Sequence, residues 1–199
     1  MISISATQGV LRGCCWLVCC PAWVWRGISD PLAFPEIEQL RGDRGGDLSA
    51  LAGRAWDAVI DLSGTHPEWV RQSGGRLAAS IEHYLLLSST AVYAAFDRRP
   101  ADESLVLRDD GPEFGARKAG CEREAEHALP GRVYTPRSVY TVGAGDPAGR
   151  LDAWFDAIKA GPTLELPGPP ELVVQLPSPR PRTAVRGGRG APRSASLRQ

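Results

Sequence analysis

The sequence predicts an α/β fold in which helices cover both faces of a parallel β-sheet. Through the middle of the chain, apolar runs typical of buried strands alternate with amphipathic runs typical of helices. This alternation favours parallel strands, because parallel neighbours are joined by helical crossovers. Of the 199 residues, 43% are hydrophobic and 23% are charged, which is a globular composition. We therefore expect neither a coiled coil, nor a collagen-like fibre, nor a chain that is disordered throughout.

The expected strands are short and largely apolar. The runs DAVIDLS and HYLLLSS have the composition of parallel strands that are buried on both faces. Pro136 splits the last run, RVYTPRSVY, because proline has no N–H group to donate to a neighbouring strand. Strands are expected at 37–40, 57–63, 83–89 and 132–140.

The expected helices alternate with these strands and carry recognisable end signals. Asp47 is a candidate N-cap, Pro67 lies in a first turn, and Gly161 is a candidate C-terminal cap. The run EFGARKAGCEREAEHAL gives the strongest helix, since apolar and small residues recur in it at helical spacing. Helices are expected at 47–53, 67–80, 113–129 and 150–161.

Charge and cysteine are distributed unevenly, which divides the chain into three parts. The chain has 23 basic and 23 acidic residues, but all the acids lie between residues 28 and 172. Only Arg12 and Arg26 are charged before that stretch, whereas six arginines and no acids follow it. We expect an atypical Cys/Trp-rich segment over 1–26, a folded domain over 27–175 and a disordered Arg/Pro-rich tail over 176–199.

The two ends admit several interpretations. The run GCCWLVCCPAWVW resembles the apolar part of a secretory signal, although no clear small-residue cleavage site follows it. Its paired cysteines suggest zinc, but a second pair of ligands is missing downstream, so no metal is expected. A third interpretation is that these residues were never selected as part of a fold. The tail is either a basic arm that binds phosphates or, more simply, a solvated segment.

Three features lie where strands of such a sheet would end, which is where α/β sheets carry their sites. Asp43, in the RGDR loop, offers a carboxylate to an adenine amino group, although Gly-Asp is also ordinary turn chemistry. Ser89, in SSTAVY, either lies over the mouth of the sheet or satisfies loop backbone. Phe114 and Lys118 share a helix face; with tyrosine at the first position, the lysine ammonium would lower the pKa of the phenol and make it a proton donor or acceptor near neutral pH. Phenylalanine has no proton to exchange.

In this order, the motifs resemble the NAD-dependent epimerase/dehydratase branch of the extended short-chain dehydrogenase/reductase superfamily. The resemblance runs from about Gly27 to about Gln175 and includes WDAVIDLSG, EHYLLLSSTAVYA, FGARKAGCE and PRSVYTVGAGDP. It implies a Rossmann-like fold, NAD or NADP as cofactor, and a small substrate, often a sugar nucleotide. We expect a cytoplasmic protein without a membrane span, and the acidic middle of the chain works against a nucleic-acid partner.

The resemblance also implies roles for individual residues. Asp43 corresponds to the aspartate that contacts adenine, and Gly64 to the loop that passes under the cofactor. Ser89 corresponds to the residue that hydrogen-bonds the substrate oxygen, and Lys118 to the lysine that holds the nicotinamide ribose. Phe114 stands where the catalytic tyrosine belongs.

The chain departs from the family pattern at both ends as well as at Phe114. Residues 1–26 contain no G-x-x-G-x-x-G turn, whose backbone amides would bind the pyrophosphate, and family-like sequence stops near residue 176. We therefore expect an incomplete fold and an enzyme that is impaired or inactive. The abrupt changes suggest shifted reading frames or a decayed gene. The alternatives are a non-catalytic nucleotide- or RNA-binding relative, or a fragment without a function of its own.

Overall fold

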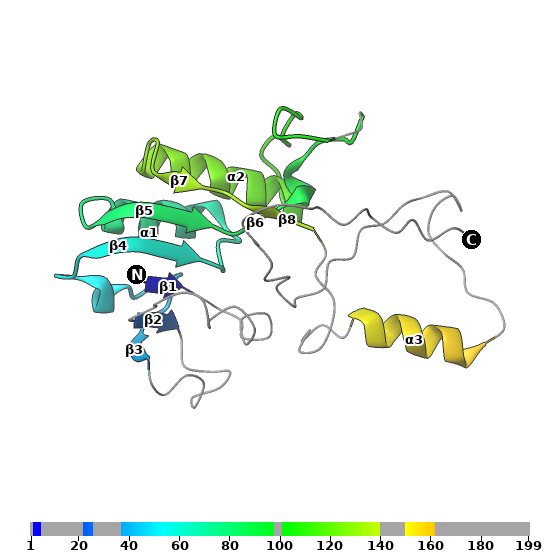
Figure 1. Ribbon diagram of the computed structural model, residues 1–199, viewed down its shortest axis with the longest axis horizontal. Coiled ribbons are helices and arrows are strands. Elements are labelled where there is room, and N and C mark those ends of the chain that lie inside the picture. The colour runs from blue at the N-terminus through cyan, green and yellow to red at the C-terminus, as the bar shows by residue number, and fades with distance from the viewer. Residues whose placement is uncertain (1, 5–21, 26–36, 98–100, 140–149, 162–199) are drawn as a thin grey trace, which may run out of the picture.

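The computed structural model describes residues 2–4, 22–25, 37–97, 101–139 and 150–161 (Figure 1). The strands of its main sheet are β1 (Ile2–Ile4), β2 (Ala22–Trp25), β3 (Glu38–Arg41), β4 (Trp56–Asp61), β5 (Ile81–Leu86) and β7 (Val133–Tyr134). A small second sheet pairs β6 (Ser88–Ser89) with β8 (Arg137–Ser138). The helices are α1 (Pro67–Leu77), α2 (Phe114–Ala128) and α3 (Arg150–Ala160).

The main sheet is parallel throughout, and its strand order is β3-β2-β1-β4-β5-β7. The order reverses at β1, which pairs with β2 on one side and with β4 on the other. This is the order of a doubly wound Rossmann sheet, in which ligands bind beyond the carboxyl ends of the strands. The α/β class and the parallel Rossmann-like sheet predicted from the sequence are confirmed.

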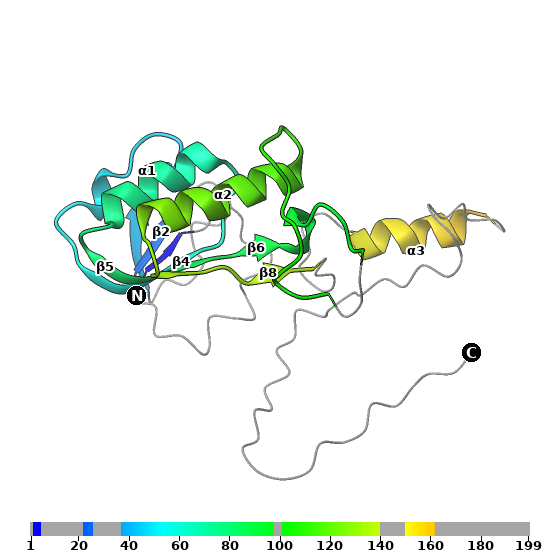
Figure 2. The same ribbon diagram turned by 90° about the horizontal axis from the view of Figure 1, so that it is seen from above.

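The core lies between the sheet and the pair of helices α1 and α2. Figure 2 shows these helices side by side on one face of the sheet. Val59 and Tyr84 of the sheet and Val70 of α1 are almost fully buried there. The helices cross closely because their contact residues are small. A Cβ atom added at Gly120 would lie 2.8 Å from Pro67 Cγ.

A smaller apolar cluster lies beyond the carboxyl end of β5. A single 3-10 turn over residues 90–92 follows β6, and Tyr93 then forms an antiparallel bridge with Leu107. Val92, Leu105 and Ala119 complete this cluster, so the loop that precedes α2 packs on α2 itself. The cluster fixes the start of α2 next to the end of β6.

Several elements differ from the sequence-based expectation. The main sheet includes β1 and β2, which lie in the segment over 1–26 that the composition sets apart. The helix expected over 47–53 is only a 3-10 turn over Ser49–Leu51, and Asp47 Oδ1 accepts a hydrogen bond from the Ser49 N–H group rather than capping an α-helix. The strand expected over 83–89 is divided into β5 and β6.

The remaining expectations concern segments at the periphery of the described structure. Pro136 separates β7 from β8 as predicted. Side chains 152–160 of α3 are exposed, including Trp154 and Phe155. The cysteine pairs, the stretch before residue 37 and the arginine tail lie outside the described residues, apart from β1 and β2. No described helix has the length and apolar character needed to cross a membrane.

Candidate functional site

The loop after β3 carries Asp43 at its exposed edge. The Asp43 carboxylate accepts a hydrogen bond of 2.9 Å from the Gly45 N–H group, and the Asp43 N–H group donates to the Asp47 carbonyl at 2.8 Å. The loop is therefore closed by its own polar groups, as in turns where an aspartate side chain accepts from the N–H group two residues further on. The carboxylate remains at the surface, at the carboxyl end of the sheet.

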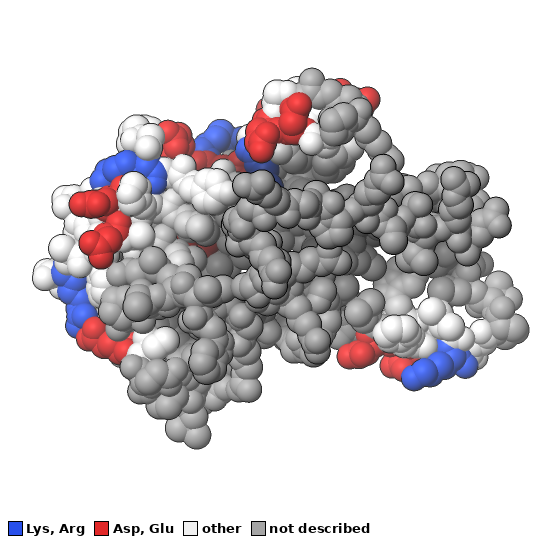
Figure 3. Space-filling view, viewed as in Figure 1, with Lys and Arg blue, Asp and Glu red and all other residues white. Residues whose placement is uncertain are grey.

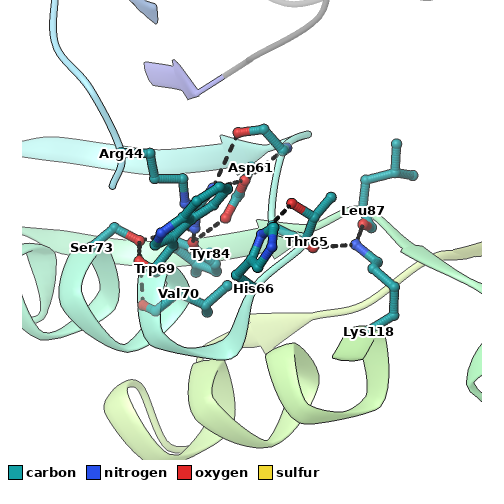
Figure 4. Close-up of polar contacts among 12 residues, drawn as sticks. Arg44, Asp61, Thr65, His66, Trp69, Val70, Ser73, Tyr84, Leu87 and Lys118 are labelled. Atoms are coloured by element: carbon teal, nitrogen blue, oxygen red, sulfur yellow. Dashed lines mark hydrogen bonds and ion pairs between the residues drawn. The ribbon is translucent and has the colours of Figure 1, made fainter. Parts of the chain in front are cut away.

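The neighbouring residue, Arg44, points the other way and is buried. Its guanidinium forms an ion pair with Asp61, which is fully buried at the end of β4. The same guanidinium donates to Ser73 Oγ at 3.0 Å and to Ser63 Oγ at 3.3 Å. Tyr84 Oη donates to Asp61 Oδ2 at 2.5 Å and accepts a hydrogen bond from Arg44 at 3.4 Å. We call these five residues the Arg44 network (Figure 4).

The charges in the Arg44 network stabilise each other. Burial opposes the charge on Arg44, but the adjacent Asp61 carboxylate and Tyr84 hydroxyl together outweigh it and raise the pKa of Arg44 above its ordinary value. Burial, together with the same carboxylate, raises the pKa of Tyr84, so its hydroxyl stays protonated and donates. The network therefore holds one buried cation and one buried anion, each with hydrogen-bonding partners.

Lys118 connects α2 to the carboxyl ends of β4 and β5. Its Nζ donates to the Gly64 carbonyl and to the Leu87 carbonyl, both at 2.6 Å, and only 4% of the residue is exposed (Figure 4). Burial lowers the pKa of this ammonium. Gly64 packs closely on the sheet: an added Cβ atom would lie 2.4 Å from Leu86 Cδ1, so the buried Leu86 side chain would have to shift. Gly64 and Lys118, two residues named from the sequence, are thus in direct contact.

Ser89 and Phe114 lie further along the same carboxyl edge of the sheet, where β6 ends and α2 begins. Ser89 Oγ accepts a hydrogen bond of 3.2 Å from the Ala91 N–H group, so it caps the turn that follows β6. The start of α2 abuts this turn, since a Cβ atom added at Gly115 would lie 2.1 Å from the Ala91 carbonyl oxygen. Phe114 is 48% exposed, one helical turn before Lys118. Its ring offers no group for proton transfer.

A second polar cluster lies beside Ser89, and its contacts could not be read from the sequence. Arg137 of β8 forms a bidentate ion pair with Glu122 of α2, at 3.1 and 2.7 Å. It also donates to Tyr93 Oη at 2.9 Å and lies over that ring at 4.9 Å from the centroid. The hydrogen bond to Glu122 is the main cause that raises the pKa of Arg137. The cluster ties β8 and α2 to the segment after Ser89.

The Arg44 network was missed as well, although one signal was present. Asp61 stands inside the largely apolar run DAVIDLS, and a carboxylate there needs a buried partner. Nothing local identifies Arg44, 17 residues earlier, as that partner. The half-buried aromatic pair of His66 and Trp69 was also missed, and its ring centroids lie 4.0 Å apart.

Other kinds of site are not supported in the described part of the chain. No group of three or more histidine, cysteine or acidic side chains is placed to hold a metal ion there. Burial raises the pKa of Cys121 to about 11, so this thiol is a core side chain and not a nucleophile. On the face drawn in Figure 3, acidic and basic side chains lie next to one another along the left margin, and both signs occur on α3 at the lower right.

No model of a known protein family matches the chain, and no curated protein matches it. Solved structures match its fold. A protein assigned as an epimerase from Burkholderia cenocepacia J2315 gives a TM-score of 0.69 at 18% identity, over 90% of this chain and 67% of that chain. The UDP-N-acetylglucosamine 4-epimerase from Methanobrevibacter ruminantium M1, solved with UDP-N-acetylmuramic acid, gives 0.67 at 15% identity, over 90% and 69%.

MoeE5, solved with UDP-glucose and NAD, is a third structural neighbour. It gives a TM-score of 0.54 at 18% identity, over 80% of this chain and 60% of that chain. This chain therefore spans between 60% and 69% of the length of these three proteins. The sheet order and these neighbours agree with the resemblance found in the sequence: the chain has the Rossmann-like fold of the NAD-dependent epimerases and short-chain dehydrogenases/reductases.

Proposed function

We propose that this chain binds NAD or NADP at the carboxyl edge of its sheet, as a protein of the epimerase/dehydratase type with a small substrate such as a sugar nucleotide. The observation that carries the proposal is the hydrogen bonding of Lys118 to the ends of β4 and β5, with Asp43 and Ser89 at the same edge. In a Rossmann sheet, this edge is where dinucleotides bind.

The polar groups along this edge fit a dinucleotide. The exposed Asp43 carboxylate can accept a hydrogen bond from the amino group of adenine. The Lys118 ammonium and the Ser89 hydroxyl can donate to ribose and substrate hydroxyl groups. The MoeE5 structure, which shares this fold, contains NAD and UDP-glucose, and this supports the same classes of ligand here.

The proposed catalysis is impaired at the proton-transfer step. NAD(P), when bound, would accept or supply hydride. The chain itself has to move a proton to or from the substrate oxygen, and Phe114 cannot do so. Loss of a positioned acid or base costs about 10²–10⁴-fold in rate. Lys118 still holds the strand ends together through the two carbonyls, so binding survives better than turnover.

A calorimetric titration of NAD and NADP into the full chain tests the proposal. We expect Asp43→Asn to weaken binding about tenfold, because a hydrogen bond to a charged group is worth roughly 1.5 kcal/mol or more. Asparagine keeps the oxygen that accepts from Gly45, so the loop is preserved. Asp57→Asn, at an exposed position on β4, is the matched control and should bind like the unmodified chain. Absence of binding by the unmodified chain would overturn the proposal.

A further inference from the structure

We infer that the Arg44 network is a positioning device: it fixes the Asp43 carboxylate and so makes the site select adenine over purines that lack the 6-amino group. The inference rests on the proposed function, because it assumes that a dinucleotide binds beside Asp43. It assigns a role to Arg44, Ser73 and Tyr84, none of which touches the proposed ligand.

The Arg44 network holds the loop that carries Asp43 from the buried side of that loop. Arg44 follows Asp43 directly, so fixing the Arg44 side chain restricts the backbone that carries the carboxylate. The guanidinium is held by Asp61 of β4, Ser73 of α1 and Tyr84 of β5, which belong to three different elements. A loop with the sequence RGDRGGD contains three glycines, and the hydrogen bonds of Asp43 to Gly45 and Asp47 restrict it from within, without tying it to the rest of the fold. The anchor therefore removes freedom that the loop sequence itself would allow.

Helix α1 also contacts the outer side of this loop. The Trp69 indole packs on Gly45, where an added Cβ atom would lie 3.2 Å from Trp69 Nε1 and 3.6 Å from Asp43 Oδ1. Ser73 lies one turn further along α1, and its hydroxyl donates to the Trp69 carbonyl at 2.9 Å. The same hydroxyl accepts from Arg44 (Figure 4), so α1 contacts the loop at two positions, Arg44 and Gly45.

Removing the Arg44–Asp61 ion pair from water costs desolvation free energy, which argues for a role beyond stability. A buried ion pair is a weak source of stability, because apolar side chains of similar volume usually do as well. The arrangement instead gives one loop a single conformation. Adenine offers an amino group to a carboxylate, whereas hypoxanthine presents a carbonyl oxygen at the same position and is repelled. Such discrimination needs a polar group held in place, since a mobile carboxylate would turn away.

The test compares two dinucleotides, NAD and nicotinamide hypoxanthine dinucleotide, by calorimetric titration. We expect the unmodified chain to prefer NAD by about tenfold or more. Ser73→Ala removes the contact of Ser73 with Arg44, and Tyr84→Phe removes the contacts of Tyr84 with Arg44 and Asp61; each variant should reduce this preference severalfold. Ser80→Ala is the matched control, because Ser80 Oγ also donates to a backbone carbonyl, that of Leu77, but lies outside the network. It should keep the preference.

Thermal unfolding of each variant separates positioning from stability. A lower melting temperature with an unchanged NAD preference, in both Ser73→Ala and Tyr84→Phe, would make the network merely structural and overturn the inference. Equal binding of the two dinucleotides by the unmodified chain would overturn it too, while leaving the proposed function standing. If the unmodified chain binds neither dinucleotide, the proposed function and the inference fail together.

Discussion

At the scale of single residues, Phe114 is the departure from the family pattern that limits the proposed catalysis. It lies one turn before Lys118 on α2, where a tyrosine would be needed for proton transfer. We expect Phe114→Tyr alone to give no measurable NAD(P)H turnover with a panel of UDP-sugars, followed by the absorbance of the reduced nicotinamide. Two of the three N–H groups of Lys118 already donate to carbonyls and the third is the one proposed for ribose, so none is left to activate a new phenol.

The matched control for that substitution is Phe96→Tyr. Phe96 is also an exposed phenylalanine, at 55%, but it lies outside α2, next to Tyr93. Turnover that appears with Phe114→Tyr and not with Phe96→Tyr would show that the missing hydroxyl is the only defect. The prediction would then be wrong, and the site would be intact apart from one side chain.

Asp61 is the residue on which we expect stability to depend most directly. Asp61→Asn removes the anion of the Arg44 network and leaves the Arg44 charge buried without its counter-ion. Breaking a buried pair in this way costs about 3–5 kcal/mol. Urea unfolding followed by tryptophan fluorescence measures the loss. Asp57→Asn, exposed on the same strand, should change the free energy of unfolding by less than about 0.5 kcal/mol. Equal unfolding midpoints for the two variants would contradict the prediction.

At the scale of elements, the sequence predicted those whose residues are patterned over a long enough run. Helix α2 was expected over 113–129 and extends over Phe114–Ala128. Strand β4 and helix α1 were likewise predicted within a few residues. Strand β1 was not, because three residues are too few for a period-2 pattern, and its place in the sheet depends on pairing with distant strands. The Arg44 network could not be predicted for the same reason, since its members meet only after β3, β4, β5 and α1 have assembled.

Two glycines in helices test how tightly the elements pack. In Gly115→Ala the new methyl group would lie 2.1 Å from the Ala91 carbonyl oxygen, so the start of α2 has to move. We expect a loss of about 1–3 kcal/mol, as overpacking usually causes. Gly75→Ala in α1 is the matched substitution, because its methyl group meets nothing within 4 Å. It should stabilise the protein by about 0.5–1 kcal/mol through helix propensity. Urea denaturation of both variants gives the comparison, and a stabilised Gly115→Ala would contradict the packing described.

At the scale of the whole molecule, the sequence predicted where in the sheet the candidate site lies, but not the contacts within it. Alternating strands and helices indicate the carboxyl edge of a parallel sheet, and Asp43, Ser89 and Lys118 lie along it. Their roles came from the family resemblance and stay predictions. The contacts that orient them, from Arg44 to Asp61 and from Lys118 to Gly64 and Leu87, join residues 17 to 54 positions apart. Such contacts follow from tertiary structure and leave no periodic signal in the sequence.

The domain boundary predicted at residue 27 can be tested against the sheet itself. A chain that starts there lacks β1 and β2, so β3 loses its neighbour and β4 loses its inner partner. Because β1 occupies the centre of the sheet, we expect residues 27–199 to lose cooperative thermal unfolding and near-ultraviolet circular dichroism. Residues 1–175, cut at the other predicted boundary, are the control and should unfold cooperatively. If residues 27–199 unfold as cooperatively as the full chain, then β1 and β2 contribute little to the fold and the predicted boundary is the right one.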